Sequence, residues 1–224
     1  QNQKKITTLK EATESIDFLL EKSIKERLIA DVPVGIFLSG GIDSSLIAYY
    51  AKKFHSNIAS FTIKMKNDTY DESSYAKLVA EKLGIQNNIA EFNSNEIIKS
   101  LEIIENKMDE PLGDPSILPT FLLSKFAKES VKVALSGDGA DELFCGYAPF
   151  KSVQYLKFLS LIPQNFGHII TSFMEKIPSQ DNYMSYHFLI KHISRGFGWP
   201  SHQQVFRWMS PFSDNNILKL LNKE

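Results

Sequence analysis

Apolar and polar positions along the first part of the chain follow two periods in turn, one helical and one typical of buried strands. Apolar residues recur at helical spacing from Leu9 to about Leu28. Thr8 and Glu11 precede and open this stretch with the spacing of a capping box, so we expect an amphipathic helix. A continuous apolar run, PVGIFL at 33–38, follows and predicts a short buried strand.

The alternation continues downstream. Three further strands are predicted, at 58–63, 86–92 and 131–135. Segments with helical periodicity separate the strands, at 46–54, 71–84, 93–107 and 116–130. Gly84 stands where a helix stop belongs, and the last of these helices runs across Pro119. Since parallel strands need long crossover connections, the pattern predicts an α/β fold, an open parallel sheet with helices on both faces.

The pattern changes after Tyr147. Strand signals end there, and the rest of the chain predicts short helices rich in aromatic residues and punctuated by Pro163, Pro178, Pro200 and Pro211. We therefore expect an α/β domain at 1–147 and a helical C-terminal segment at 148–224, truncated within its last helix, which starts at a Ser213 cap. No basic stripe accompanies the aromatic residues, so we expect them to serve helical packing or domain contacts rather than base stacking.

Composition narrows the class of function. The chain has 224 residues, 43% of them hydrophobic, and a formal net charge of −1, which argues against a nucleic-acid or anionic-membrane surface and favours small-molecule chemistry. No apolar run approaches the roughly 18 residues of a membrane span, and the N-terminal stretch has no hydrophobic signal core. The single cysteine, Cys145, excludes an intrachain disulfide, so we expect a cytoplasmic protein.

The first Gly-rich segment, SGGIDSS at 39–45, has the composition of a phosphate-binding loop. Gly40 and Gly41 allow backbone N–H groups to converge, and hydroxyl donors come from Ser39, Ser44 and Ser45. The N-terminus of the following helix adds a partial positive charge at the same place. The segment lacks the lysine of a Walker A motif and does not have the GxGxxG spacing, so simple γ-phosphate transfer and dinucleotide binding are both disfavoured.

Asp43 is the informative residue of this loop. A carboxylate inside an anion site repels phosphate unless a cation lies between them, so we interpret Asp43 as a Mg²⁺ ligand. The alternative is an ordinary glycine turn in which Asp43 caps the helix.

A second Gly-rich segment, SGDGADE at 136–142, follows the last predicted strand. Ser136 and Gly137 open a turn, and Asp138, Asp141 and Glu142 come after it. In an open parallel sheet the carboxyl ends of the strands share one edge, and ligands bind where the strand order reverses. We therefore expect the two loop-bearing strands to be neighbours, with Asp43 and Asp141 on one Mg²⁺ and Asp138 near the reacting centre; an EF-hand is excluded by the ligand spacing.

These motifs carry a family resemblance. SGGIDSS resembles the SGGxDS pyrophosphate loop of the N-type ATP pyrophosphatases. Within this group, the chain resembles the synthetase half of the asparagine synthetase branch. The resemblance rests on four segments in the same order: DVPVGIFLSGGIDSSLIA, YDESSYAKLVAEKLG, DEPLGDPSILPTFLLSKFA and VKVALSGDGADELFCGY. The resemblance covers roughly residues 9–150 and is loose in the tail.

The resemblance implies an ATP-dependent, AMP-forming amide synthesis. Members of the family activate a carboxylate, here the side chain of aspartate, as an acyl adenylate that ammonia converts to asparagine. By position, the resemblance assigns adenosine contacts to Leu38 and Ile63 and pyrophosphate contacts to Ser39, Gly40, Gly41, Asp43, Ser44 and Ser45. It assigns further nucleotide contacts to Ser136 and Gly137, intermediate formation and ammonia attack to Asp138, and Mg²⁺ to Asp43 and Asp141.

Three departures from the family pattern qualify these expectations. The chain lacks the glutaminase domain with its N-terminal cysteine, which we expect as a partner in the full-length protein, and it ends before the family's catalytic lysine, so we expect it to bind ATP but turn over poorly. Cys145 stands where the family usually has glycine, and we expect a small packed residue there rather than a nucleophile. A homodimer is one assembly that the sequence leaves open.

The substrate acid is also open. The segment MDEPLGDPS at 108–116 resembles a substrate-side wall in the family but has no arginine to bind an α-carboxylate, and Asp114 in it serves equally well as the start of the next helix. A second hypothesis therefore keeps the adenylation step but changes the acid, as in β-lactam synthetases or cell-surface amidotransferases. A third is a nucleotide-binding fragment without catalysis.

Overall fold

The computed structural model describes residues 6–65, 71–110, 112, 114–147, 149–150, 156–176, 186–210, 212, 217 and 219. The chain divides into two compact units, Gln1–Asp138 and Gly139–Glu224. The domain boundary that the sequence suggests near residue 147 stays a prediction. Most of the helix expected after Ser213 lies outside the described residues.

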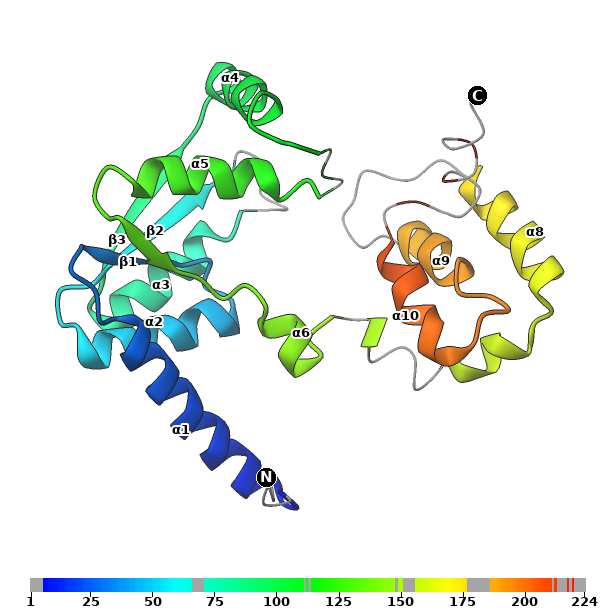
Figure 1. Cartoon of the computed structure of the whole chain (residues 1–224), viewed down its shortest axis with the longest axis horizontal. Helices are drawn as coiled ribbons and strands as arrows, with labels where there is room; N and C mark the ends of the chain where they lie inside the picture. The colour runs from blue at the N-terminus through cyan, green and yellow to red at the C-terminus, as the bar shows by residue number, and fades with distance from the viewer. Residues whose placement is uncertain are drawn as a thin grey trace. The chain divides into compact units, whose positions relative to one another are not determined.

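The first unit is built around a parallel sheet of four strands in the order β3-β2-β1-β4 (Figure 1). Every neighbouring pair in the sheet is parallel. The strands are β1 Val34–Phe37, β2 Ala59–Lys64, β3 Gln86–Glu91 and β4 Val133–Leu135. The four strands and the parallel sheet expected from the hydrophobic pattern are therefore confirmed.

Five helices of this unit also match the predicted segments: α1 Leu9–Arg27, α2 Ile42–Phe54, α3 Ser73–Leu83, α4 Ser94–Glu105 and α5 Ile117–Ala127. The capping box of Thr8 and Glu11 is present at the start of α1. Gly84 ends α3 in the left-handed conformation with φ 62°. Pro119 lies in the first turn of α5, where its missing N–H has no intrahelical partner to lose.

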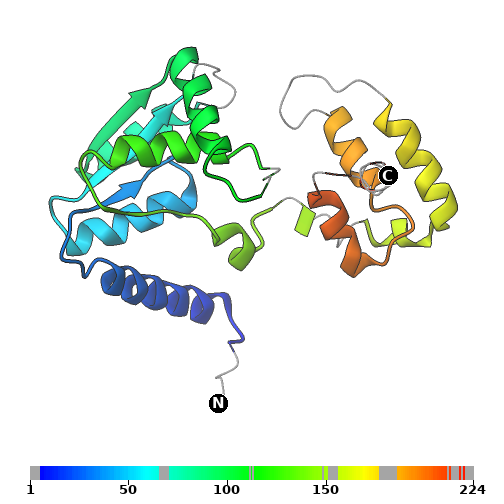
Figure 2. The ribbon, with the colours of Figure 1, turned by 45° about the horizontal axis from the view of Figure 1, so that its top comes forward.

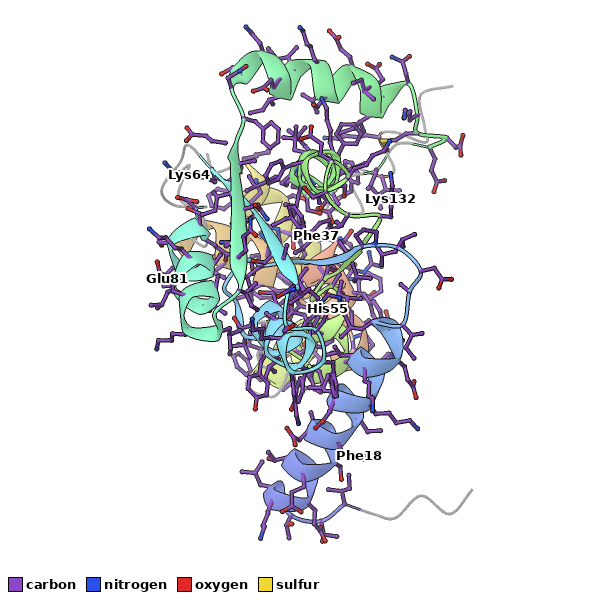
Figure 3. The ribbon with its side chains drawn as sticks, turned by 90° about the vertical axis from the view of Figure 1, so that its left-hand side faces the viewer. Phe18, Phe37, His55, Lys64, Glu81 and Lys132 are labelled. Atoms are coloured by element: carbon purple, nitrogen blue, oxygen red, sulfur yellow. The ribbon has the colours of Figure 1, made fainter. Side chains whose placement is uncertain are left out.

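Helices cover both faces of the sheet because alternate strand residues point to opposite sides (Figure 2). On one face, Ile36 and Leu38 are buried with residues of α1, α2 and α3. On the other, Phe37 of β1 and Phe61 of β2 pack against α5, and α4 packs on α5 in turn. Figure 3 shows Phe37 at the sheet and Phe18 on α1. Phe18 is 66% exposed, so it lies outside this core.

Gly35 explains how β1 fits beneath the large ring of Phe61. A Cβ atom on Gly35 would lie 2.7 Å from a ring carbon of Phe61 and 3.2 Å from a methyl carbon of Val131. The ring of Phe61 therefore occupies the space that a side chain at position 35 would need.

The described part of the second unit is helical. It contains α6 Ala140–Phe144, the 3₁₀ helix η1 Lys157–Leu161, α8 Gln164–Glu175, α9 Tyr186–Ser194 and α10 Ser201–Met209. α9 packs against both α8 and α10. Trp208 is 4% exposed, and its indole N–H donates to the Ile193 carbonyl at 3.0 Å, so this aromatic residue serves helical packing as expected.

Cys145 corrects one expectation. Its side chain is exposed rather than packed, and its φ is 55°, the only positive value at a non-glycine residue in the described part of the chain. Cys145 ends the short helix α6 in the left-handed conformation, a position that glycine normally occupies. The backbone turn, not the small size of the side chain, explains the preference for glycine there.

Among the described residues, none of the helices combines the length and the apolarity that crossing a bilayer requires.

A candidate nucleotide site at the ends of strands β1 and β4

The strand order places the two Gly-rich loops side by side. From β1 the chain moves to β2 and β3 on one side of the sheet, and it returns as β4 on the other side of β1. The carboxyl ends of β1 and β4 therefore border the point where the strand order reverses, the usual ligand position in open α/β sheets. The prediction that the loop-bearing strands are neighbours is confirmed by the parallel pairing of Val34 with Val133 and Ile36 with Leu135.

The first loop is held in shape by its own hydroxyl groups. The Ser39 and Ser44 Oγ atoms lie 3.0 Å apart, and the N–H of Gly41 donates to Ser39 Oγ at 3.2 Å. The N–H of Ser39 in turn donates to Ser44 Oγ at 3.3 Å. Ser44, which is 6% exposed, thus braces the loop from inside, whereas Ser39 is exposed.

The start of α2 offers unpaired backbone donors. Gly41 is the N-cap residue and makes no side-chain cap bond, and the N–H of Ser45 donates to the Gly41 carbonyl at 3.0 Å. Helix geometry leaves the N–H groups of Ile42, Asp43 and Ser44 ahead of this bond without intrahelical acceptors. They lie where the helix dipole favours an anion. Gly41 occupies the N-cap position and Asp43 lies in the first turn of α2, so the two interpretations of Asp43, a Mg²⁺ ligand or a residue that stabilises the helix start, both stay predictions.

Gly40 is required by both conformation and space. Its φ is 87°, and a Cβ atom there would lie 2.5 Å from the backbone N of Ala76 and 2.5 Å from the carbonyl carbon of Tyr75. The loop therefore lies directly on the first turns of α3. Gly40 thus allows a loop path that a residue with a side chain could not take, and glycine-rich backbone of this kind can approach a phosphate closely.

The second loop approaches the same helix start. A Cβ atom on Gly137 would lie 3.0 Å from the backbone N of Ser44 and 3.1 Å from Cβ of Asp43. The loop after β4 thus reaches the N-terminal turn of α2 through a glycine. Next to it, Ser136 Oγ donates to Asp138 Oδ2 at 2.7 Å, which orients the exposed Asp138 carboxylate beside the turn.

Ser45 adds a further polar group to this turn. Its Oγ atom is buried and has no hydrogen-bond partner among the described residues. Buried hydroxyl groups in proteins are nearly always bonded, to protein or to a bound group. The converging amides, the glycine-lined surface and this hydroxyl together fit a bound oxyanion such as a nucleotide phosphate.

The two aspartates predicted to bind magnesium belong to different units of the chain. Asp43 is half-buried in the first turn of α2, whereas Asp141 lies in α6 of the second unit. No group of three or more acidic, histidine or cysteine side chains that could bind a metal occurs within the described ranges. Mg²⁺ is commonly held by one or two carboxylates together with phosphates and water, so Asp43 and Asp141 are each of a suitable ligand type for an ion that arrives with a nucleotide. Their joint role stays a prediction.

The two residues assigned to adenosine contact differ in access. Leu38 is 2% exposed, and its side chain belongs to the core packed against α2 and α3. Its backbone is also bonded within the sheet, because the Leu38 N–H donates to the Phe61 carbonyl at 3.0 Å and the Leu38 carbonyl accepts from Thr62 at 2.7 Å. An adenosine contact of Leu38 stays a prediction. Ile63 is half-buried near the carboxyl end of β2, in register with Ala90 of β3.

Other acidic residues that the sequence singled out have local partners. Asp114 Oδ1 accepts a bond from the Ser116 N–H at 2.8 Å, which lowers the pKa of Asp114, so this residue shapes the turn that leads into α5. Glu142 Oε1 accepts a bond from the Tyr147 hydroxyl at 2.7 Å, which lowers the pKa of Glu142. Both carboxylates are therefore stabilised in the ionised form.

Two polar residues beneath the first loop, Thr62 and Asn87, were not predicted from the sequence. Thr62 Oγ1 donates to the Leu38 carbonyl at 2.7 Å, at the last residue before the first loop. Asn87 lies 3.0 Å from the same hydroxyl. One feature of the sequence could have indicated them: Ser60 and Thr62 stand at alternate positions of an apolar strand, where buried polar side chains need hydrogen-bond partners.

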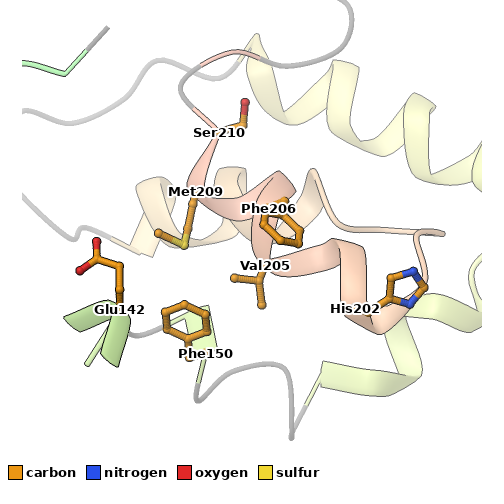
Figure 4. A pocket seen from close by; sticks show the side chains of 7 residues that line it. All are labelled: Glu142, Phe150, His202, Val205, Phe206, Met209 and Ser210. Carbon is orange, nitrogen blue, oxygen red and sulfur yellow. The ribbon is translucent and has the colours of Figure 1, made fainter. Parts of the chain in front are cut away.

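The second unit contains an open hollow of about 600 Å³ (Figure 4). Apolar side chains from α10 form much of its wall. Its lining consists of Glu142, Phe150, His202, Val205, Phe206, Met209 and Ser210. Glu142 of the second Gly-rich segment is among them, but none of the residues assigned to the nucleotide, to Mg²⁺ or to catalysis is.

Known proteins similar to this chain belong to the family that the loop sequences resemble. A family model described as asparagine synthase matches residues 15–209. The chain is 42% identical over 141 residues to asparagine synthetase [glutamine-hydrolyzing] 1 of Bacillus subtilis, an alignment that covers 63% of this chain and 22% of that protein. It is 36% identical over 151 residues to a putative asparagine synthetase [glutamine-hydrolyzing] of Mycobacterium bovis, covering 67% of this chain and 23% of that protein.

The chain therefore spans less than a quarter of the length of these curated relatives. Among solved structures, an NH3-dependent NAD synthetase from Campylobacter jejuni matches 60% of each chain with a TM-score of 0.41 and 20% sequence identity.

Proposed function

This chain belongs to the asparagine synthase family, and from that premise we propose that it binds ATP at the ends of β1 and β4 and promotes cleavage between the α- and β-phosphates to activate a carboxylate. The observation that carries the proposal is the meeting of the two Gly-rich loops at one helix start. Gly137 lies against the backbone of Asp43 and Ser44, next to the free amides of α2. A loop of this kind without a Walker lysine suits the binding of a departing pyrophosphate better than transfer of the γ-phosphate.

In this proposal the backbone binds the pyrophosphate portion of ATP. The N–H groups of Ile42, Asp43 and Ser44 and the exposed Ser39 hydroxyl donate to phosphate oxygens. Negative charge on the pyrophosphate grows as its bond to the α-phosphorus breaks, so donors fixed in advance at that position stabilise the transition state more than the ground state. The glycines keep side chains out of the space that the phosphates need.

Asp43 and Asp141 are the residues that would hold Mg²⁺. When bound, the ion neutralises charge on the phosphates and on the leaving pyrophosphate. Asp138 would then face the α-phosphate side, where the Ser136 hydroxyl fixes its carboxylate. With a side chain shorter than glutamate, Asp138 positions the reacting groups rather than transferring a proton directly.

The acid that we propose is aspartate. Its side-chain carboxylate oxygen would attack the α-phosphorus, the bond to the pyrophosphate oxygen would break, and ammonia would then displace AMP to give asparagine. A glutaminase domain outside this chain would supply the ammonia. The names of the relatives, glutamine-hydrolysing asparagine synthetases, support both points.

The proposal is tested by ATP–pyrophosphate exchange. A longer chain that includes the region of the family's catalytic lysine is incubated with ATP, Mg²⁺ and labelled pyrophosphate while the carboxylate is varied, and ATP binding is measured separately by calorimetry. Exchange that depends on aspartate supports the proposal. Exchange with another acid alone would transfer the same chemistry to that acid. ATP binding without exchange on any acid would indicate a non-catalytic nucleotide-binding module, and an absence of ATP binding would refute the site itself.

A further inference from the structure

A pair of buried hydroxyl groups lies beneath the first loop. Ser60 and Thr62 of β2 are 0% and 3% exposed. Thr62 Oγ1 lies 2.7 Å from the Leu38 carbonyl, and Ser60 Oγ lies 3.3 Å from the Gln86 carbonyl. Both hydroxyls also lie 3.0 Å from one side-chain atom of Asn87, its Oδ1 as placed.

The number of protons decides the direction of these bonds. Each hydroxyl has a single hydrogen, so neither can donate both to a backbone carbonyl and to an Asn87 oxygen. A carbonyl can only accept, and both carbonyls face the hydroxyls. As placed, the Asn87 amide nitrogen is buried and lacks a partner among the described residues. One arrangement resolves the conflict: a half-turn of the Asn87 amide, which exchanges its oxygen and its nitrogen.

We propose that Asn87 is a positioning residue for the nucleotide loop, with its amide nitrogen between the two hydroxyls. Its two N–H groups then donate to Ser60 Oγ and Thr62 Oγ1, and each hydroxyl donates its own hydrogen to a carbonyl. Thr62 is thereby fixed as the donor to Leu38. The chain of bonds runs from β3 through β2 to the last residue before the loop.

This chain of bonds fixes one peptide unit on both sides. The Leu38 carbonyl accepts from Thr62, and the Ser39 N–H of the same peptide plane donates to Ser44 Oγ at 3.3 Å. A peptide plane held at both ends sets the direction in which Gly40 and Gly41 leave the strand. The amides that would meet the phosphates therefore take their orientation in part from Asn87. This role rests on the proposed ATP site, whereas the hydrogen-bond arrangement itself does not.

The arrangement is tested by NMR on the whole chain. The side-chain amide protons of Asn87 should exchange with water at least tenfold more slowly than those of the exposed Asn57, and should show nuclear Overhauser effects to protons of Ser60 and Thr62. Fast exchange, or no such effects, would overturn the assignment. This measurement needs no nucleotide, so it stands even if the ATP site does not.

The positioning role is tested by MgATP affinity in three variants. Thr62→Val keeps the shape but removes the donor to Leu38, and we expect about tenfold weaker binding; Thr62→Ser restores the hydroxyl and should bind within about twofold of the parent chain. Ser60→Ala is the matched control, since it removes an equally buried hydroxyl of the same network that does not reach Leu38. Equal losses in Thr62→Val and Ser60→Ala, or none in Thr62→Val, would overturn the role. An unmutated chain that fails to bind MgATP would instead refute the proposed function.

Discussion

Gly137 provides the sharpest test of the meeting of the two loops. In Gly137→Ala the new methyl carbon would lie 3.0 Å from the Ser44 nitrogen, 3.1 Å from Asp43 Cβ and 3.4 Å from the Asp43 carbonyl carbon. Two of these atoms are backbone atoms of a helix start and cannot rotate away as the end of a flexible side chain would. The loops must therefore separate by a few tenths of an ångström, and the methyl group covers an amide that would face a phosphate.

The size of the effect follows from the lost bond. A hydrogen bond to a charged group contributes about 1.5–3 kcal/mol, so removing the Ser44 N–H from a phosphate oxygen should weaken ATP binding by roughly 10- to 100-fold. Calorimetric titration with MgATP measures the loss. The free energy of unfolding should fall by about 1–3 kcal/mol, the usual cost of one extra methyl group in a packed site.

Gly139→Ala is the control for this experiment. Gly139 has φ 87° but no atom within 4 Å of the added Cβ, so alanine there brings backbone strain without a clash. We expect a similar or smaller loss of stability and ATP binding within about threefold of the parent chain. If Gly137→Ala binds ATP as tightly as Gly139→Ala does, the loop after β4 does not form part of the phosphate site.

Three further outcomes are expected. Gly40→Ala should reduce the free energy of unfolding by about 3 kcal/mol or more in urea titrations, because φ is 87° there and the new Cβ would lie 2.5 Å from the α3 backbone. Gly84→Ala is the control: with φ 62° and open space around the Cβ, it should reduce that free energy by only about 1 kcal/mol. Cys145→Gly should raise the free energy of unfolding by roughly 0.5–1 kcal/mol, since the left-handed conformation is strained for cysteine. Cys145→Ala should leave the free energy of unfolding unchanged, because alanine is strained in the same way. Thermal melts in which Cys145→Ala is the more stable variant would contradict this explanation. The bond that Tyr50 donates to Asp17 raises the pKa of Tyr50 to about 12. Because the pKa of this acid is higher in the folded state, its stabilisation is complete below pH 10 and is lost as the pH rises toward 12; a Tyr50→Phe chain should show a smaller alkaline loss of stability, and equal losses would argue against this bond.

Much of the first unit could be predicted from the sequence because its signals are local. Apolar runs predicted β1, β2 and β4, and the alternation of helix and strand signals predicted the mostly polar β3. The capping box at Thr8 and the stop at Gly84 marked the ends of helices where the structure has them. A capping bond or a left-handed glycine depends on residues a few positions apart, so a linear sequence contains the necessary information. The same holds for the loop after β1, whose serines and glycines bond mainly to one another.

The tertiary structure decided what depends on contacts between distant segments. The strand order brings β4 beside β1, and with it Gly137 against the start of α2, although 93 positions separate residues 44 and 137 in the chain. The hydrogen bonds of Thr62 and Asn87 form only when three strands are aligned, because the partners of a buried hydroxyl lie on neighbouring strands. Cys145 could be recognised as an exposed turn residue only from its backbone angles. The sequence by itself thus determined the elements and the chemistry of each loop, and the packing of the sheet determined which groups face one another, since such distances are set by the whole fold.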